Sequence, residues 1–261
     1  MLEHSQLWEK KAMQDSASSA LLRHLDLAGT YNLRDTGGYR TLDGRTTRWR
    51  TFLRSDSLHR VPPMVQTTLL NYGVRTVIDL RRSDELHIAP NVFASSSEVV
   101  YHHVSLLVDS LPDRKVAPRS LPDVYCMILE QRQDQLRQTL ATLAAPEGFP
   151  AIVHCTAGKD RTGLIVALLL GLVGVPAATI IEDYALSSQY LVGTYLEEAR
   201  QRAANNGIPW EWFQHQVICP PEFMQTTLQY LDARHGGIDA YMRHIGLSQE
   251  QCERLRQALL E

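Results

Sequence analysis

Residues 154–163, HCTAGKDRTG, place a cysteine and an arginine six positions apart. A cysteine thiolate is a strong nucleophile, and a guanidinium offers a planar fork to two oxygens of a phosphoryl group. Between Cys155 and Arg161, Gly158 lets the backbone curl around an anion. The spacing therefore predicts a phosphate-binding loop that carries its own nucleophile.

The segments on either side of this loop are apolar. Residues 149–153, FPAIV, suit a buried strand, and residues 164–173, LIVALLLGLV, suit a buried helix. The loop would then lie at the N-terminus of the helix, where unpaired backbone N–H groups and the helix dipole favour an anion. We expect the same field to keep Cys155 as a thiolate at neutral pH. The Thr162 hydroxyl is placed to hydrogen-bond this sulfur when it acts as a leaving group.

These residues resemble the cysteine-dependent tyrosine phosphatases. The Lys159-Asp160 pair narrows the resemblance to the atypical bacterial branch, sometimes called triple-specificity phosphatases, whose loop reads HCxxGKDR. Further matches are NLRDTGGY at 32–39, DGR at 43–45, LRSDSL at 53–58, and VIDLR at 77–81 with Glu85. The resemblance runs from about residue 32 to the C-terminus and is poorest over 106–121 and 189–221.

The resemblance implies a two-step hydrolysis of phosphomonoesters. Cys155 attacks phosphorus to form a cysteinyl phosphate, and water then releases inorganic phosphate. The substrates implied are phosphotyrosine proteins and phosphoinositides. No metal or other cofactor is expected, because the loop amides and Arg161 supply the electrostatic stabilisation. Beside His154, which supports the loop, the expected phosphate-binding residues are Thr156, Ala157, Gly158, Lys159 and Thr162.

The general acid that protonates the leaving group has several candidates. Relatives carry an aspartate on a loop thirty or more residues before the nucleophile, where this chain has Asp109, Asp113 and Asp123. Asp123 is better explained as part of a helix cap with Ser120. Asp160, within the loop as in the bacterial branch, is our choice. Its cationic neighbours favour the ionised form, whereas the thiolate and a bound phosphate favour the protonated one.

Other polar residues allow two interpretations each. Lys159 meets a second phosphate on an inositol ring, or it is a solvated lysine. Arg34 and Asp35 brace the active-site loop, or they form a solvated turn pair. Arg81 is expected with Asp79 at the sheet edge that holds Cys155, where it would contact the substrate or the loop. Alternatively, Arg81 and Arg82 form exposed ion pairs with Asp84 or Glu85. Asp183 and Tyr184 match a family pattern, but a helix-surface role is the default.

Composition limits the remaining possibilities. The 261 residues are 44% hydrophobic, enough for the core of a single α/β domain spanning 1–261. A net charge of -3 gives no field for binding nucleic acid. Residues 1–10 lack the apolar segment of a secretory signal, and the longest apolar run, 163–176, is too short to span a bilayer. The four cysteines show no CxxC or metal spacing, so we expect a reducing, cytoplasmic location, with export by another route left open.

The expected fold is α/β, with a mainly parallel central sheet of four or five strands, helices on both faces and a helical C-terminal third. Strands are predicted near 47–53, 74–80, 99–107 and 149–153, after a frayed or loosely docked end at 1–20. Helices are predicted over 63–72, 124–143, 164–173, 177–187, 189–204, 224–233, 238–245 and 248–260. Trp210, Trp212 and Phe213 lie in a possible insertion, 189–223, and form either a lid or a satellite core.

Two other functions fit part of the pattern. A rhodanese-type sulfurtransferase also carries a cysteine between strand and helix, but the Arg161-Thr162 pair and NLRDTGGY argue against it. A phospholipid or phosphopeptide reader needs neither nucleophile nor arginine. Because both Cys155 and Arg161 are present, an enzyme is the favoured interpretation.

Overall fold

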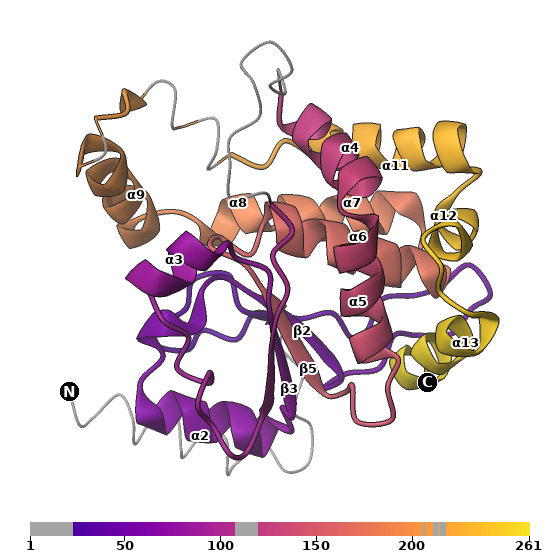
Figure 1. Cartoon of the computed structure of the whole chain (residues 1–261), viewed down its shortest axis with the longest axis horizontal. Helices are drawn as coiled ribbons and strands as arrows, with labels where there is room; N and C mark the ends of the chain where they lie inside the picture. Colours follow the sequence, from indigo (N-terminus) through magenta and orange to yellow (C-terminus); the bar gives the residue numbers. More distant parts are fainter. Residues whose placement is uncertain (1–22, 108–119, 206, 211–213, 215–217) are drawn as a thin grey trace.

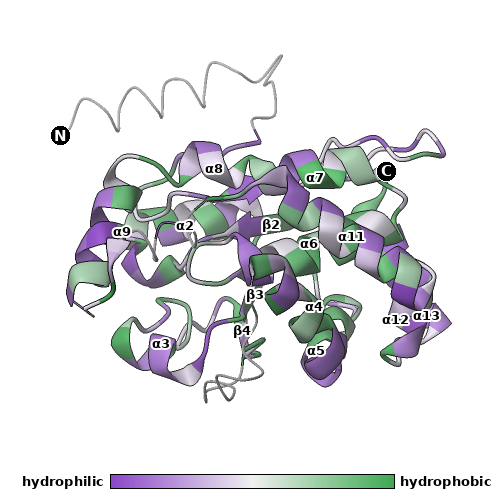
Figure 2. Cartoon of the chain, turned by 90° about the horizontal axis from the view of Figure 1, so that it is seen from above, coloured by the Kyte–Doolittle hydropathy of each residue, from purple (hydrophilic) through white to green (hydrophobic). Residues whose placement is uncertain are grey.

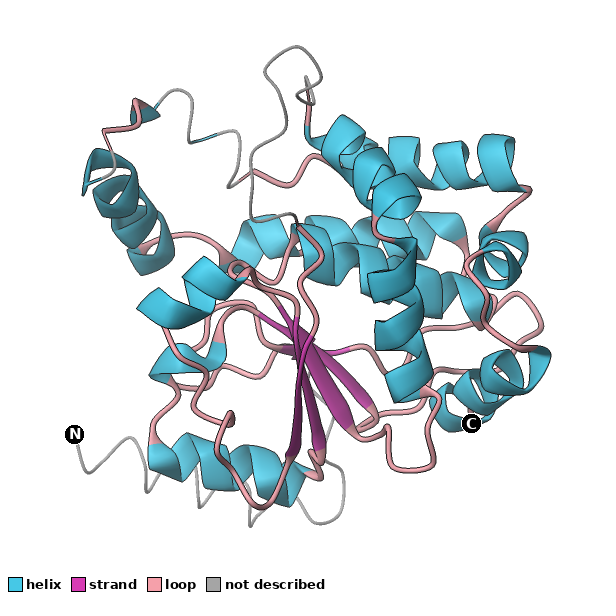
Figure 3. Cartoon of the chain, viewed as in Figure 1, coloured by secondary structure: helices cyan, strands magenta, loops and turns pink. Residues whose placement is uncertain are grey.

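A computed structural model of the chain describes residues 23–107, 120–205, 207–210, 214 and 218–261. Its centre is a sheet that has five strands in these residues (Figure 1, Figure 3). Their order is β1(Arg34–Asp35), β2(Phe52–Ser55), β5(Ala151–His154), β3(Thr76–Asp79), β4(Val100–His103). Only β1 runs antiparallel to its neighbour, so the predicted mainly parallel α/β fold is confirmed.

Both faces of the three central strands are buried. On one face, Phe52, Ile78 and Val153 belong to the larger apolar core. On the other face, their chain neighbours Leu53, Val77 and Ile152 belong to the smaller core. Alternate residues of a strand point to opposite faces, which explains why these strands read as continuous apolar runs.

Helices cover the two faces unequally (Figure 1). The smaller core packs under α2(Pro63–Tyr72), with α3(Ser83–Ile88) on the same side. The larger core lies under α4(Leu121–Gln131), α5(Gln133–Leu143), α6(Asp160–Leu172), α7(Ala177–Ala185), α11(Pro221–His235), α12(Ile238–His244) and α13(Gln249–Leu259). Figure 2 shows α6 as largely hydrophobic, which fits a helix packed between the sheet and the outer helices.

Two predicted helices are divided. The expected helix over 124–143 is two helices, α4 and α5, because Arg132 leaves the helical conformation with φ −120° and ψ 29°. The Arg132 guanidinium donates to the Ser105 carbonyl at 3.0 Å, outside both helices. The expected helix over 189–204 is instead α8(Ser187–Tyr190) followed by α9(Thr194–Asn205). The chain turns at Asp43–Gly44, with a bridge between Arg40 and Thr46.

Helix ends and the aromatic segment follow the sequence in part. Ser120 caps α4 by accepting from the Asp123 N–H, as predicted, but the Asp123 carboxylate accepts from the Ser120 hydroxyl instead of completing a capping box.

Trp210 packs with Leu191 and Tyr195 in a satellite cluster beside α9. Residues 1–20, Trp212 and Phe213 lie outside the described residues. Among the described helices, none has the length and apolar character needed to cross a membrane.

Candidate active site

The predicted nucleophile loop connects the end of β5 at His154 to the start of α6 at Asp160. Gly158 has φ +65°, and a Cβ there would lie 2.3 Å from the Ser55 carbonyl oxygen. The loop is therefore pressed against the end of β2 so closely that a larger residue would displace it. The position of the cysteine at the carboxyl ends of parallel strands is the expected place for a ligand in an open α/β sheet.

Cys155 and Arg161 form the centre of the site. Cys155 is buried, and its charge acts on Arg161. Burial lowers the pKa of Arg161, but the charges of Cys155 and Glu85 outweigh it and raise the pKa above its usual value. The guanidinium nitrogens Nη1 and Nη2 donate to the two oxygens of Glu85 at 2.6 and 3.0 Å, and Nη2 also donates to Thr156 Oγ1 at 2.9 Å.

Glu85 lies in the first turn of α3. Its carboxylate therefore occupies the guanidinium fork of Arg161, which was expected to face the phosphoryl group. Burial raises the pKa of this carboxyl, but the bonds from Arg161 and Thr156 outweigh it and bring the pKa to about 2. Glu85 remains a carboxylate at neutral pH. An incoming phosphate must either share Arg161 with this carboxylate or replace part of its contact.

Three backbone carbonyls of the loop are held by donors that come from outside it. Arg54 Nη2 donates to the carbonyls of Gly158 at 2.7 Å and Lys159 at 3.3 Å. Asn32 Nδ2 donates to the Ala157 carbonyl at 2.8 Å. Because a trans peptide directs its N–H and C=O to opposite sides, these bonds favour N–H groups that point into the loop, where an anion would bind.

The guanidinium of Arg54 belongs to a buried ion network. The Asp183 carboxylate, on α7, forms ion pairs with Arg54 Nη1 at 2.5 Å and with Arg34 Nε at 3.2 Å. All three side chains are at most 1% exposed. Burial lowers the pKa of Arg34 to about 10. Although burial raises the pKa of Asp183, the two arginines hold it below its usual value. The helix-surface role of Asp183 and the solvated interpretation of Arg34 were therefore wrong.

Arg34 and Asp35 differ in what they hold. Arg34 Nη1 donates to the Oδ1 and the carbonyl of Asn32, and so it reaches the loop through that side chain. Asp35 is equally buried but accepts from the N–H groups of Gly37 at 2.7 Å and Arg50 at 2.8 Å, and from Tyr72. Asp35 thus holds the turn after β1, and the structure does not bring it to the active-site loop.

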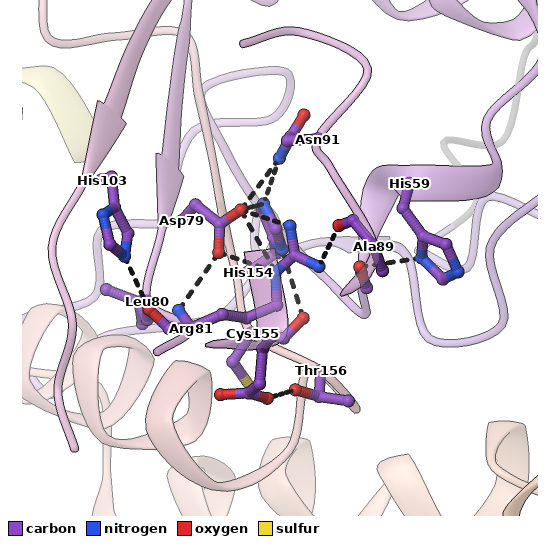
Figure 4. Close-up of polar contacts among 12 residues, drawn as sticks. His59, Asp79, Leu80, Arg81, Ala89, Asn91, His103, His154, Cys155 and Thr156 are labelled. Atoms are coloured by element: carbon purple, nitrogen blue, oxygen red, sulfur yellow. Dashed lines mark hydrogen bonds and ion pairs between the residues drawn. The ribbon is translucent and has the colours of Figure 1, made fainter. Parts of the chain in front are cut away.

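Behind the cysteine, a second buried network joins β3 and β5 (Figure 4). Arg81 pairs with Asp79 at 2.7 Å, and His154 Nε2 lies 2.7 Å from Asn91 Nδ2 and 3.3 Å from Asp79 Oδ2. The Asp79 pKa is held far below its usual value by His154 and Arg81, although burial opposes them. His154 Nδ1 also lies 3.2 Å from the Cys155 carbonyl, so the network ends at the loop.

The structure distinguishes between the two interpretations of Arg81 and Arg82, the arginines that follow β3. Arg81 is 1% exposed and pairs with Asp79, so the exposed pair with Asp84 or Glu85 was wrong for it. Within the described residues, its connection to the loop runs through Asp79 and His154. Arg82 does form that exposed pair, with 2.7 Å to Asp84.

Lys159 and Asp160 close the loop. The Lys159 side chain is fully buried, and Nζ donates to the Ile218 carbonyl at 2.8 Å and lies 3.3 Å from Asp160 Oδ1. The interpretation of Lys159 as a solvated lysine was therefore wrong. Asp160 accepts a hydrogen bond from the Tyr125 hydroxyl, which in turn lies 2.8 Å from the Tyr184 hydroxyl. The Thr162 hydroxyl is buried and has no hydrogen-bond partner among the described residues.

The other candidates for the general acid are not equivalent. Asp123 is exposed and bonded to Ser120 at the start of α4, as a cap residue would be. Asp109 and Asp113 lie outside the described residues. Of the candidates that are described, Asp160 is the one within the nucleophile loop.

Comparison with known proteins decides the family. The family model described as "Tyrosine phosphatase family" matches residues 25–261. The chain belongs to the tyrosine phosphatase family. This confirms the predicted family and the predicted class of enzyme, and it argues against the two alternatives, the sulfurtransferase and the non-catalytic reader.

Two relatives of this chain carry the names of phosphatases. A tyrosine-protein phosphatase of Nostoc commune is 32% identical over 213 residues, covering 78% of this chain and 72% of the relative. The triple specificity protein phosphatase PtpB of Mycobacterium tuberculosis is 26% identical over 277 residues, covering 90% of this chain and 98% of the relative. The crystal structure of a Cys-to-Ser variant of P. aeruginosa TpbA in complex with pTyr matches with 18% identity and a TM-score of 0.37, covering 73% of this chain and 99% of that one.

Several residues of the phosphatase site were missed or misjudged from the sequence. Arg54 and Asn32 were noted only as parts of matching segments, and Glu85 was noted there and as a possible surface partner of Arg81 or Arg82. Tyr125 carried no signal at all, since it lies in an ordinary amphipathic helix. Asp183 could have been found by asking why an acidic residue followed the apolar stripe of α7, because a carboxylate on a buried helix face requires a cationic partner.

Proposed function

We propose that this tyrosine phosphatase hydrolyses phosphotyrosine in proteins through a cysteinyl phosphate. The observation that carries the proposal is the position of Cys155 at the end of β5, in a loop that closes on the N-terminus of α6 with Arg161 in its first turn. Loop amides and Arg161 stabilise charge on the equatorial oxygens of the transferring phosphoryl group. Cys155, Arg161 and Asp160 are assigned as the catalytic residues.

In the first step, the Cys155 sulfur forms a bond to phosphorus while the bond from phosphorus to the tyrosine oxygen breaks. Asp160 gives its proton to that oxygen, so tyrosine leaves as a neutral phenol. In the second step, water attacks phosphorus, the sulfur–phosphorus bond breaks, and a water proton returns to Asp160. The Thr162 hydroxyl, which has no partner in the described part of the chain, is assigned to the thiolate that leaves in this second step.

A second substrate class, phosphoinositides, is supported by two observations. One relative, PtpB, is named a triple specificity phosphatase. This chain also carries a lysine, Lys159, inside the loop, with its Nζ 3.3 Å from Oδ1 of the proposed general acid Asp160. Since catalysis requires Cys155 as a free thiol, we assign the enzyme to a reducing compartment, such as the cytoplasm.

The test uses Cys155→Ser and Arg161→Lys with a phosphotyrosine peptide. The first variant should lose turnover but keep peptide binding, because a serine hydroxyl is a far weaker nucleophile than a thiolate. The second should also fail, because a point charge cannot replace a planar fork. Cys252→Ser, on the distant helix α13, is the control and should keep full activity. A kcat within tenfold of the parent enzyme for either active-site variant contradicts the mechanism.

A further inference from the structure

Two tyrosines from different helices meet at Asp160. Tyr125 comes from α4 and Tyr184 from α7, and both side chains are at most 1% exposed. The Tyr125 hydroxyl donates to Asp160 Oδ1, and the two hydroxyl oxygens are 2.8 Å apart. Burial, and the neighbouring Asp160, raise the pKa of both tyrosines, so both remain protonated donors.

The direction of this short chain follows from counting hydrogens. A phenol has one hydrogen, and that of Tyr125 points to Asp160. The hydrogen between the two phenols must then come from Tyr184. The chain therefore runs from Tyr184 to Tyr125 to Asp160, and each bond strengthens the next by polarising its donor.

The hydrogen bond from Tyr125 and the ion pair with Lys159 meet the same carboxyl oxygen of Asp160. Tyr125 bonds Oδ1, and Lys159 Nζ lies 3.3 Å from that oxygen. In the described part of the chain no donor reaches Oδ2, and the Asp160 side chain remains 27% exposed. An acidic proton on this carboxyl would thus reside on Oδ2, because Oδ1 already accepts.

We propose that Tyr125, supported by Tyr184, is a positioning residue for Asp160 that fixes its carboxyl and stabilises the carboxylate formed when the proton leaves. This rests on the proposed role of Asp160 as the general acid. The hydrogen bond to Oδ1 is neutral while Asp160 holds its proton, and it becomes charge-assisted as the proton moves to the leaving oxygen. Tyr125 therefore acts more strongly in the transition state than in the ground state, which is the condition for raising kcat.

Other groups also face Asp160 and remain constant in the test. Lys159 comes from the loop and Arg161 from the first turn of α6, and Arg161 senses the charges of both Cys155 and Asp160. Cys219 precedes α11 and Tyr195 lies on α9, and each senses the charge of Asp160. These groups surround Asp160 in every tyrosine variant, so a change in the pH profile of such a variant reports the missing hydroxyl.

The experiment compares Tyr125→Phe, Tyr184→Phe and the double variant. Phenylalanine keeps the ring and its edge contact, with ring centroids 6.3 Å apart, and removes only the hydroxyl. Tyr125→Phe should lower kcat on a phosphotyrosine peptide about tenfold, because a hydrogen bond to a charged group is lost. Without the donor, Asp160 holds its proton more tightly, so the high-pH limb of the kcat profile should move up by about one pH unit.

The leaving group and the second tyrosine provide the discriminating results. Hydrolysis of 2,4-dinitrophenyl phosphate, whose leaving group needs no proton, should change less than twofold in Tyr125→Phe. Tyr184→Phe should shift the pH limb in the same direction by less, and adding it to Tyr125→Phe should change nothing further. Tyr230→Phe removes a tyrosine–carboxylate bond to Glu130 far from the loop and should match the parent enzyme.

Failure of this inference is distinguishable from failure of the proposed acid. If Asp160→Asn slows the peptide but spares the dinitrophenyl ester, Asp160 is the acid. Tyr125→Phe with an unchanged pH profile, or with equal losses on both esters, would then overturn the role of Tyr125 alone. If Asp160→Asn slows both esters equally, the assignment of the acid is wrong and the inference falls with it.

Discussion

Glu85 and Arg161 form a two-point ion pair at the mouth of the nucleophile loop, with distances of 2.6 and 3.0 Å. The pair joins α3 to the first turn of α6, and Thr156 adds its hydroxyl to the same carboxylate. Arg161 is thereby held in one orientation before any substrate arrives. Preorganisation of this kind reduces the cost of ordering the guanidinium in the transition state.

Glu85→Gln should therefore lower kcat/KM for a phosphotyrosine peptide by about ten- to hundredfold, the loss expected for a charge-assisted hydrogen bond. The thermal midpoint should change little, because the Glu85 side chain is 21% exposed and the amide retains its shape. Asp84→Asn is the matched control, since Asp84 is its neighbour on α3 and pairs with Arg82 at the surface. Similar losses in the two variants would show that Glu85 acts only through the stability of α3.

The contact between Arg54 and the loop leads to a second prediction. Arg54→Lys keeps a positive charge near Asp183, but one ammonium cannot serve that carboxylate and also the Gly158 carbonyl as the guanidinium does. The loop carbonyl then loses its donor and the amides lose their orientation. Inhibition by inorganic phosphate should weaken about tenfold, measured as the inhibition constant in steady-state assays.

Arg34→Lys provides the control for this prediction. Arg34 shares Asp183 with Arg54 and is equally buried, but it donates to Asn32 and Ser187 rather than to the loop backbone. Both variants should lose stability to urea by a similar amount, because each disturbs the same buried network. Phosphate binding should fall at least fivefold more in Arg54→Lys. Equal effects on phosphate binding would contradict a direct role of Arg54 in orienting the loop.

The parts of this molecule that could be predicted are those formed by residues that are contiguous in the sequence. The nucleophile loop, its strand and its helix lie within 149–173, and the turn residue Gly158 has the required positive φ. The alternation of strands and helices also follows from local patterns of apolar residues. The parallel order of β2, β5 and β3 placed Asp79 beside His154, as expected from sheet geometry.

The residues that surround the loop could not be predicted because their partners are far away in the sequence. Arg54 meets Asp183 across 129 positions, and Tyr125 meets Asp160 across 35. A buried charge is stable only when its partner is present, and one sequence does not reveal which distant residue that is. The break at Arg132 was missed for the same reason, since its guanidinium bonds Ser105 outside the helix.

The last prediction concerns Lys159 and the range of substrates. Its ammonium is buried between the Ile218 carbonyl and Asp160. A lysine is rarely buried without such partners. The phosphate of a ligand is a stronger acceptor than a neutral carbonyl, and the flexible lysine chain allows Nζ to turn toward a second phosphate on an inositol ring. Phosphotyrosine has no such second phosphate.

Lys159→Met, which keeps much of the aliphatic chain, should therefore reduce hydrolysis of a short-chain phosphatidylinositol bisphosphate more than that of a phosphotyrosine peptide. We expect about a tenfold larger loss of kcat/KM on the lipid, the effect of one charge-assisted contact. Lys159→Arg keeps the charge and should keep the ratio of the two activities within about threefold of the parent enzyme. Phosphate release from both substrates under identical salt measures this ratio. Equal losses on peptide and lipid in Lys159→Met would mean that Lys159 serves only the shared phosphate site and Asp160, and that the enzyme's selectivity for lipids must come from other residues.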